Sequence, residues 1–172
     1  DEEGIAEIDN KFEIGAKLTD IYNLSQPVID INITPNRGDC LGVYGIARDL
    51  ASAGLGKLKS LDIKDLSGNF DSKINVKINK DSQNICNYFS GYYIKNITNK
   101  ESPSWLKEKL EAIGVNPINA IVDITNYTMY CLNQPLHAYD ADKIIGDIEV
   151  RTAKSQEEFT SLKDFKYKLD GG

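Results

Sequence analysis

The chain has 172 residues, 41% of them hydrophobic and 27% charged, which is enough for one domain with a sizeable core. Its net charge of −6 argues against a basic surface that coats nucleic acid, but not against contact with one RNA end held within a larger assembly. Three widely spaced cysteines and one histidine do not form a set of zinc ligands, and they favour a reducing compartment. No apolar run reaches the roughly 18 residues of a membrane helix, and we expect no signal peptide.

The first 26 residues are acidic at their start and weakly patterned, with Gly4 and Gly15 as interruptions. We interpret residues 1–26 as a linker or as the tail of a preceding domain. Residues 28–33, VIDINI, then carry isoleucine at every second position. This alternation predicts a strand.

A turn and a helix are predicted next, over residues 34–54. The turn, TPNRGD, ends in Asp39, a residue type that N-caps helices. The helix LGVYGIARDLASAG would end before Gly54, a favourable residue just after a helix. Gly42 and Gly45 would let a neighbouring backbone come close, although each lowers helix propensity by about 1 kcal/mol.

The TPNRGD turn has two interpretations. A turn before a helix can bind a phosphate, because helix N-termini attract anions. This turn lacks a glycine-rich loop with a following lysine. We therefore favour Arg37 as a structural clamp on carbonyls or on a carboxylate.

Two strands are predicted in the middle of the chain. A lysine- and aspartate-rich connection at residues 56–70 precedes KINVKIN, residues 73–79, whose two isoleucines and valine would face inward. NYFSGYYIKNI, residues 87–97, is aromatic and rich in β-forming residues. Its tyrosines and Trp105 could stack on bases, but an acidic surface and strand-like spacing favour core packing.

Two helices are predicted after these strands. Ser102 would cap the first and Pro103 would be its first helical residue, with Gly114 marking its end. The second would follow Asn119 and run through Leu132. Its β-branched residues leave helix and strand ambiguous by periodicity alone.

The C-terminal part predicts a strand at residues 147–153 and a hairpin at residues 159–169 that turns near 163–164. Asp140 is expected to cap a short turn, and Asp123 to tie down a loop rather than act as a catalytic acid. The whole pattern predicts an α+β fold with mixed or antiparallel sheets packed with a few helices.

Residues 116–140, NPINAIVDITNYTMYCLNQPLHAYD, contain the candidate site residues. His137 is the only histidine of the chain, and histidine has an ordinary pKa near neutrality. Thr125 and Asn126 lie in an otherwise apolar stretch, where buried polar groups need partners. From the residues alone, His137 could instead cap a helix or edge the core, and Thr125 and Asn126 could be a helix-interior pair satisfied by backbone carbonyls.

Three blocks occur in order at residues 30–51, 102–144 and 149–162, and they include the motifs TPNR, INAIVDITNY and QPLHAYD. Together they closely resemble the tRNA-editing domain in the beta chain of bacterial phenylalanyl-tRNA synthetases. The resemblance spans nearly the whole chain. It implies that residues 1–26 are the end of a preceding linker and residues 27–172 the N-terminal part of a single editing-type domain.

The resemblance implies a role in the cytoplasmic, ATP-dependent attachment of phenylalanine to tRNA(Phe) by two alpha and two beta chains. The ATP, Mg²⁺ and phenylalanine sites would lie elsewhere, largely on the alpha chain, so we expect no cofactor, metal or membrane contact in this segment. Tyrosine differs from phenylalanine by one hydroxyl, and an apolar pocket rejects such an analogue only roughly a hundredfold. A second site would therefore hydrolyse tyrosyl-tRNA(Phe).

Residue by residue, the resemblance implies that Thr125, Asn126 and His137 line this editing site. Thr125 and Asn126 would hydrogen-bond the amino acid, and His137 would orient or activate water, with a ribose hydroxyl of the tRNA end as another possible helper. In the family a later Leu-Ala-Gly segment and a glutamate complete the pocket, beyond Gly172. We therefore expect weak or absent editing by this chain alone. The alternative is a non-catalytic module that links domains or positions tRNA.

Overall fold

The computed structural model describes residues 8, 12–22, 27–162 and 164–171. These residues form two compact units, each built from two separate stretches of the chain. The first unit is Asp1–Leu61 with Thr98–Ala138, and the second is Asp62–Ile97 with Tyr139–Gly172. Much of the predicted linker, and Lys163 of the predicted hairpin turn, lie outside the described residues. The boundary at residue 27 stays a prediction.

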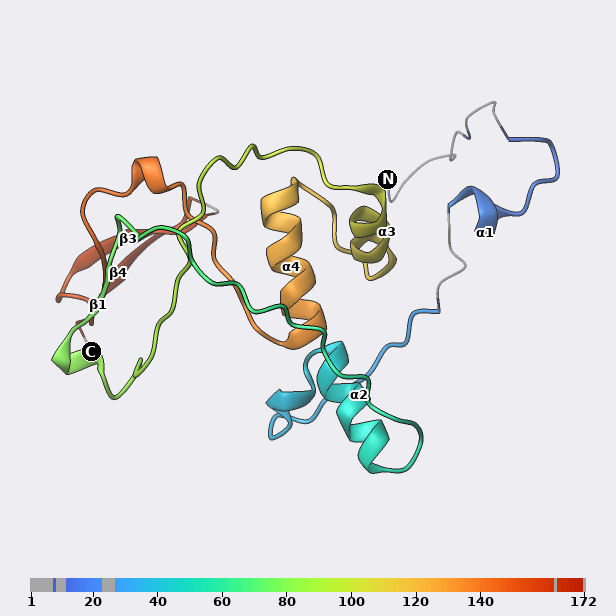
Figure 1. Ribbon diagram of the computed structural model, residues 1–172, viewed down its shortest axis with the longest axis horizontal. Coiled ribbons are helices and arrows are strands. Elements are labelled where there is room, and N and C mark those ends of the chain that lie inside the picture. Colours follow the sequence, from blue (N-terminus) through green and yellow to red (C-terminus); the bar gives the residue numbers. More distant parts are fainter. Residues whose placement is uncertain (1–7, 9–11, 23–26, 163, 172) are drawn as a thin grey trace. The chain divides into compact units, whose positions relative to one another are not determined.

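The first unit is helical (Figure 1). Helix α4 contacts both α2 and α3, and α2 also contacts a short 3₁₀ turn, η1, that precedes it. The elements of this unit are α1 (Leu18–Ile21), η1 (Gly38–Cys40), α2 (Val43–Ser52), α3 (Ser104–Ala112) and α4 (Ala120–Leu132).

Glycine ends α2 and α3 as predicted. Gly54 and Gly114 adopt φ values of +78° and +76°, in the left-handed region that favours glycine. After α2, the Leu55 N–H donates to the carbonyl of Leu50, and after α3 the Val115 N–H donates to that of Leu110. Each of these two bonds satisfies a carbonyl that the end of a helix leaves without a partner.

The predicted starts of α2 and α3 were wrong. Asp39 does not cap α2, which begins after Gly42, because the Asp39 carboxylate instead accepts hydrogen bonds from two arginines. Ser102 does not cap α3, whose N-cap is Pro103, because its hydroxyl donates to Asp123. In both places another side chain binds the polar group that would otherwise have capped the helix.

Helix α4 confirms the prediction over residues 120–132 and resolves its ambiguity. The Asn119 side chain accepts a hydrogen bond from the Val122 N–H at 3.1 Å, which caps the helix. Asn133, with φ +56°, ends it in the left-handed region. The core of this unit includes Leu106 and Leu110 of α3, which are 2% and 1% exposed.

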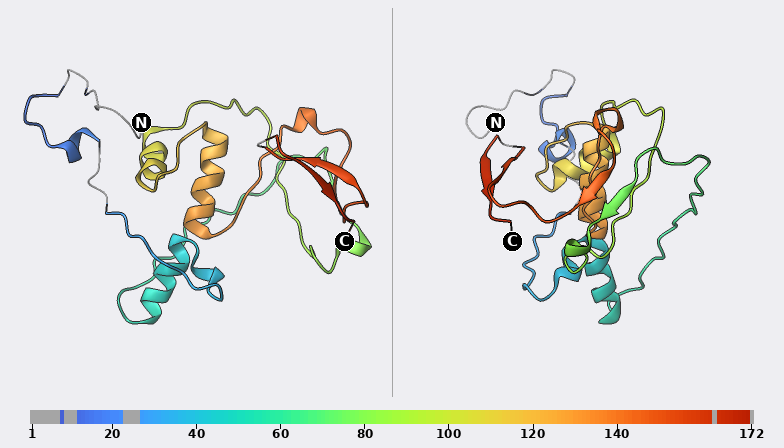
Figure 2. Two further views of the ribbon diagram at one scale, coloured as in Figure 1. Left: turned by 180° about the vertical axis from the view of Figure 1, so that it is seen from behind. Right: turned by 90° about the vertical axis from the view of Figure 1, so that its left-hand side faces the viewer.

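The second unit contains two small sheets. Strand β1 pairs in parallel with β2, with Val76 opposite Ile148, and β3 pairs with β4 as an antiparallel hairpin. The two hairpin strands lie side by side in the left view of Figure 2. The bounds are β1 (Val76–Ile78), η2 (Lys80–Ser82), η3 (Ala141–Lys143), β2 (Ile148–Val150), β3 (Glu157–Thr160) and β4 (Lys166–Leu169).

The predictions for these strands are confirmed, although β1 and β2 are shorter than predicted and the hairpin begins at Glu157 rather than at residue 159. Ile74, Val76 and Ile78 are half-buried while Lys77 is exposed, as the alternation required. Asp140 caps η3 by accepting a hydrogen bond from the Asp142 N–H at 3.2 Å, also as predicted. The small sheets and few helices confirm an α+β fold.

Two predicted strands, at residues 28–33 and 87–97, were wrong. Both segments are fully described and neither contains a strand. Ile29 is 77% exposed and Tyr92 81% exposed, so core packing of these tyrosines was also wrong for Tyr92 and Tyr88. Alternation and β-propensity supply an apolar face, but a strand also needs a partner backbone for its N–H and C=O groups.

Within the described part of the chain, no helix combines the length and apolar character needed to cross a membrane.

Candidate functional site

The three predicted site residues lie in the same compact unit. Thr125 and Asn126 are adjacent and half-buried in the middle of α4. His137 is exposed and lies in the irregular segment that follows the helix. The candidate site therefore consists of two adjacent positions in the middle of α4 and the segment that leaves that helix.

The hydrogen-bonding role of the Thr125 hydroxyl is fixed. Thr125 Oγ1 donates to the Val122 carbonyl at 2.7 Å, because a carbonyl can only accept. This confirms, for Thr125, the interpretation of a side chain satisfied by a backbone carbonyl. The oxygen keeps lone pairs, so toward a ligand Thr125 can act only as an acceptor while that bond holds.

The N-terminal end of α4 is anchored through Asp123, which is completely buried. Its carboxylate accepts one hydrogen bond from Ser102 Oγ at 2.5 Å and another from the Ile118 N–H at 2.9 Å. The prediction that Asp123 ties down a loop is confirmed. A buried carboxylate with both oxygens bonded holds the chain before α3 and the α3–α4 loop against α4.

A hollow of about 170 Å³ lies at this anchored end of α4. Glu101 and Lys107, both on its lining, form an ion pair. Thr125, Asn126 and His137 do not line this hollow. Its lining residues are Glu101, Ser102, Lys107, Glu111, Pro117, Ile118 and Asp123.

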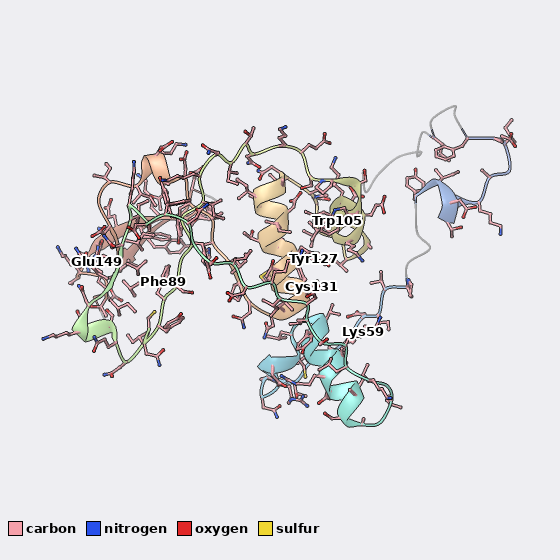
Figure 3. All side chains as sticks on the ribbon, in the orientation of Figure 1. Lys59, Phe89, Trp105, Tyr127, Cys131 and Glu149 are labelled. Atoms are coloured by element: carbon pink, nitrogen blue, oxygen red, sulfur yellow. The ribbon has the colours of Figure 1, made fainter. Side chains whose placement is uncertain are left out.

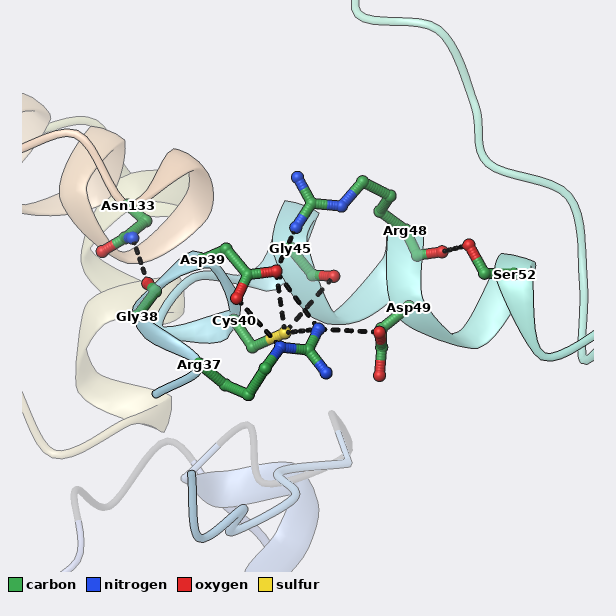
Figure 4. Close-up of polar contacts among 9 residues, drawn as sticks. All are labelled: Arg37, Gly38, Asp39, Cys40, Gly45, Arg48, Asp49, Ser52 and Asn133. Atoms are coloured by element: carbon green, nitrogen blue, oxygen red, sulfur yellow. Dashed lines mark hydrogen bonds and ion pairs between the residues drawn. The ribbon is translucent and has the colours of Figure 1, made fainter. Parts of the chain in front are cut away.

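The C-terminal end of α4 is anchored to the loop of residues 34–42, referred to below as the TPNR loop. Asn133 Nδ2 donates to the Gly38 carbonyl at 2.6 Å (Figure 4). Gly42 lies so close that a Cβ there would stand 2.7 Å from the Asn133 backbone nitrogen. This confirms the close backbone approach predicted for Gly42. The sequence reasoning missed Asn133, although an Asn followed two residues later by Pro135 is typical of a helix end.

Arg37 holds the TPNR loop on α2, as Figure 4 shows. Its Nε donates to Asp39 at 3.0 Å, and its Nη2 donates to Asp49 at 2.7 Å and to Cys40 Sγ at 2.8 Å. Arg48 also pairs with Asp39. The predicted clamp on a carboxylate is confirmed, and a guanidinium already paired twice is poorly placed to bind a phosphate.

These contacts change the acidity of the groups in the loop. Hydrogen bonds from Arg37 lower the pKa of the Asp39 carboxyl to about 2, and the bonds to Asp39 and Asp49 raise the pKa of Arg37. Burial raises the pKa of the Cys40 thiol. The pair of Arg37 and Asp39 is therefore charged near neutral pH, and the neutral thiol of Cys40 is favoured.

Aromatic side chains connect α3 and α4 (Figure 3). The rings of Trp105 and Tyr127 meet edge to face, with centroids 5.4 Å apart. A hydrogen bond with Cys131 and partial burial raise the pKa of Tyr127. Trp105 contacts Tyr127 but keeps 48% of its own surface exposed, so the predicted core packing of Trp105 was wrong.

A second hollow, of about 340 Å³, lies in the other unit between residues 66–72 and 91–95. Phe70 and Tyr93 meet edge to face with centroids 6.2 Å apart, and Lys95 Nζ lies 4.0 Å from the centre of the Phe70 ring. Tyr92 also lines this hollow and is exposed. Base stacking by these tyrosines was the less favoured alternative from the sequence, and it stays untested.

Among the described residues, no three His, Cys, Asp or Glu side chains are grouped so that they could hold a metal ion. Cys40, Cys86 and Cys131 are free thiols.

Comparison with known proteins gives a consistent result. Residues 85–172 match the family model described as the B3/4 domain. A phenylalanine–tRNA ligase beta subunit of Paramagnetospirillum magneticum is 47% identical over 100% of this chain and 22% of its own length. Proteins of the same name from Ehrlichia ruminantium (strain Welgevonden) and Bartonella henselae are 49% and 44% identical, over 98% and 97% of this chain and 22% and 21% of their lengths. The chain thus spans about a fifth of the length of these relatives.

Proposed function

Since this chain belongs to the B3/4 domain family and is similar along its whole length to phenylalanine–tRNA ligase beta subunits, we propose that it edits tRNA(Phe) within such a subunit. The proposed reaction is hydrolysis of the ester that joins tyrosine to tRNA(Phe). The proposed partners are the alpha chain, tRNA(Phe) and the bound tyrosine, in the cytoplasm. ATP and Mg²⁺ serve the charging reaction and bind outside this segment.

The physical need for such a site comes from the similarity of the two amino acids. An apolar pocket that accepts phenylalanine rejects an analogue with an extra hydroxyl only about a hundredfold. A polar site can instead select tyrosine over phenylalanine. It binds tyrosine through the phenol hydroxyl and releases phenylalanine, because the polar groups of the site would otherwise stay unpaired.

The proposed roles follow the chemistry of each group. Thr125 accepts a hydrogen bond from the amino acid, since its own proton is committed to the Val122 carbonyl. Asn126, with an amide that can donate and accept, completes the contact. His137 orients or activates the water that attacks the ester, and a ribose hydroxyl of the tRNA end can share that task.

One observation carries the proposal. Thr125 and Asn126 stand half-buried on a helix that tertiary hydrogen bonds anchor at both ends, through Asp123 and Asn133. A pair held in this way is preorganised, which favours selective binding over loose contact. His137 follows the same helix and is open to solvent, where a tRNA end could reach it.

The test uses the intact enzyme of alpha and beta chains. Hydrolysis of tyrosyl-tRNA(Phe) is measured for wild type and His137→Ala, with phenylalanyl-tRNA(Phe) as the control substrate and Lys168→Ala, an exposed change on β4, as the control variant. We expect His137→Ala alone to lose tyrosine removal and to keep phenylalanine charging. Unchanged hydrolysis would remove His137 from the site, and lost charging would give it a structural role.

The competing proposal is a non-catalytic module that links domains or positions tRNA. Its support is that neither described hollow is lined by the three candidate residues. A titration of the intact enzyme with free tyrosine separates the two proposals. Binding that weakens in Thr125→Val supports editing, whereas no effect of that change favours the structural module.

A further inference from the structure

We propose that the TPNR loop positions His137 through Asn133. This inference deepens the proposed function and rests on it. Asn133 acts here as a positioning residue that sets the direction in which the chain leaves α4 toward His137. Three features of the structure support this role.

The first feature is the geometry of Asn133 itself. Its φ of +56° turns the backbone out of the helix, and its N–H donates to the Met129 carbonyl at 2.8 Å. Its side chain donates to the Gly38 carbonyl at 2.6 Å. Backbone and side chain together fix the last turn of α4 and the direction of the exit.

The second feature is the close approach of Gly42. A Cβ at this position would stand 2.7 Å from the Asn133 nitrogen and 3.2 Å from the Tyr130 carbonyl oxygen. A glycine here therefore lets the TPNR loop lie directly on the end of α4. The contact includes backbone on both sides, which leaves little freedom for the two segments to slide.

The third feature is the stiffness of the loop. Arg37 bonds Asp39 within the loop and Asp49 on α2, so the loop and the helix are joined by charged hydrogen bonds. Cys40, buried within the loop, also receives a bond from Arg37. The Gly38 carbonyl that receives Asn133 is thus part of a braced structure.

The distance along the chain from Asn133 to His137 is short. Four residues of at most about 3.6 Å each keep the two Cα atoms within about 14 Å. Pro135, between them, has a fixed φ, which removes one more degree of freedom. A change in the exit direction at Asn133 would therefore displace His137 relative to Thr125 and Asn126.

The test compares variants of Asn133 in the intact enzyme of alpha and beta chains. Asn133→Asp replaces the donor with an acceptor that repels the Gly38 carbonyl, and Asn133→Gly keeps the left-handed backbone but removes the bond. Asn99→Ala is the matched control, because its side chain accepts a backbone hydrogen bond from Ile121 at the other end of α4. His137→Ala is measured beside them.

We expect both Asn133 variants to lower kcat for tyrosyl-tRNA(Phe) hydrolysis about 10- to 100-fold, as misplacement of a reacting group does. KM, the melting temperature of Asn133→Gly and phenylalanine charging should stay close to wild type, and Asn99→Ala should keep kcat. An unchanged kcat in both Asn133 variants overturns the inference. A fall in kcat together with a raised KM and lost phenylalanine charging also overturns it, because general structural damage gives that result.

The two proposals fail in distinguishable ways. If His137→Ala loses tyrosine removal while the Asn133 variants keep it, only the positioning role fails. If His137→Ala keeps full hydrolysis, the editing role of His137 fails, and with it the positioning of that residue.

Discussion

Ser102 and Asp123, 21 residues apart, share a buried hydrogen bond of 2.5 Å from Ser102 Oγ to Asp123 Oδ2. The other carboxylate oxygen accepts the Ile118 N–H, so Asp123 is bonded on both sides while completely shielded from water. A buried polar group that loses one of its partners is costly, because nothing replaces the lost bond. This pair therefore matters more to stability than an exposed bond of the same length.

Replacing Ser102 with alanine should lower the free energy of unfolding by about 1–3 kcal/mol, because Asp123 would be left partly unsatisfied. Urea unfolding of the chain measures this change. Ser52→Ala, which removes an exposed bond to the Arg48 carbonyl, is the matched control and should change stability by less than about 0.5 kcal/mol. Equal effects of the two substitutions would show that burial of the Ser102 bond has no special weight.

Replacing Thr125 with valine should weaken editing of tyrosyl-tRNA(Phe) by roughly tenfold, because valine has the same shape but no oxygen to accept a bond from the amino acid. Thr125→Ser should retain most of the activity. Thr128→Val is a close control, since the Thr128 hydroxyl makes the same kind of bond, to the Ile124 carbonyl at 2.8 Å. If Thr125→Val and Thr128→Val behave alike, Thr125 has no contact with the substrate.

Replacing Gly45 with alanine should destabilise the chain by about 1–3 kcal/mol, as overpacking does. The added Cβ would stand 1.9 Å from the Asp39 carbonyl oxygen, so the TPNR loop would have to move away from α2. Gly56→Ala, with no atom within 4 Å of its Cβ position, should have little effect. Midpoints of urea unfolding compare the two, and a stable Gly45→Ala would show that the loop can yield at no cost.

The lowered pKa of Glu157 predicts that the stability of the fold depends on pH. Hydrogen bonds from Arg151 and from the Lys154 N–H lower the pKa of Glu157 to about 2, from an ordinary 4.5. A carboxyl whose pKa is lower in the folded state stabilises the fold above pH 4.5, and loses this effect as the pH falls through about 2. Stability should therefore decline over this window.

Glu157→Gln should be less stable than wild type at pH 6 and should depend less on pH between 5 and 2. Urea unfolding across this range measures the slope, with Glu158→Gln on the same strand as the control. Parallel slopes for wild type and Glu157→Gln would mean that the pair of Arg151 and Glu157 does not couple folding to protonation.

The elements that the sequence predicted well depend on local signals. Asn119 caps α4, and Gly54 and Gly114 follow the ends of α2 and α3, because each signal acts on backbone groups within a few residues. The hairpin of β3 and β4 is equally local. Its ladder pairs Phe159 with Tyr167, and sequence alternation around a short turn is enough to predict such a pair.

The errors all involve a choice of partner. Asp39 and Ser102 have the side chains of good caps, but Arg37 and Asp123 bind them instead. Residues 28–33 and 87–97 have the composition of strands, yet the structure pairs neither of them. Composition cannot tell which of several possible partners the fold will bring near.

The sequence by itself determined the α+β class, the extent of α4, the candidates Thr125, Asn126 and His137, and a resemblance that the comparisons bear out. These rest on residue types and on contacts close along the chain. Only the tertiary structure showed that Asn133 bonds Gly38, 95 residues earlier, and so connects the TPNR loop to the exit from α4. Such a bond depends on the free energy of packing distant segments together, which no local pattern of residues records.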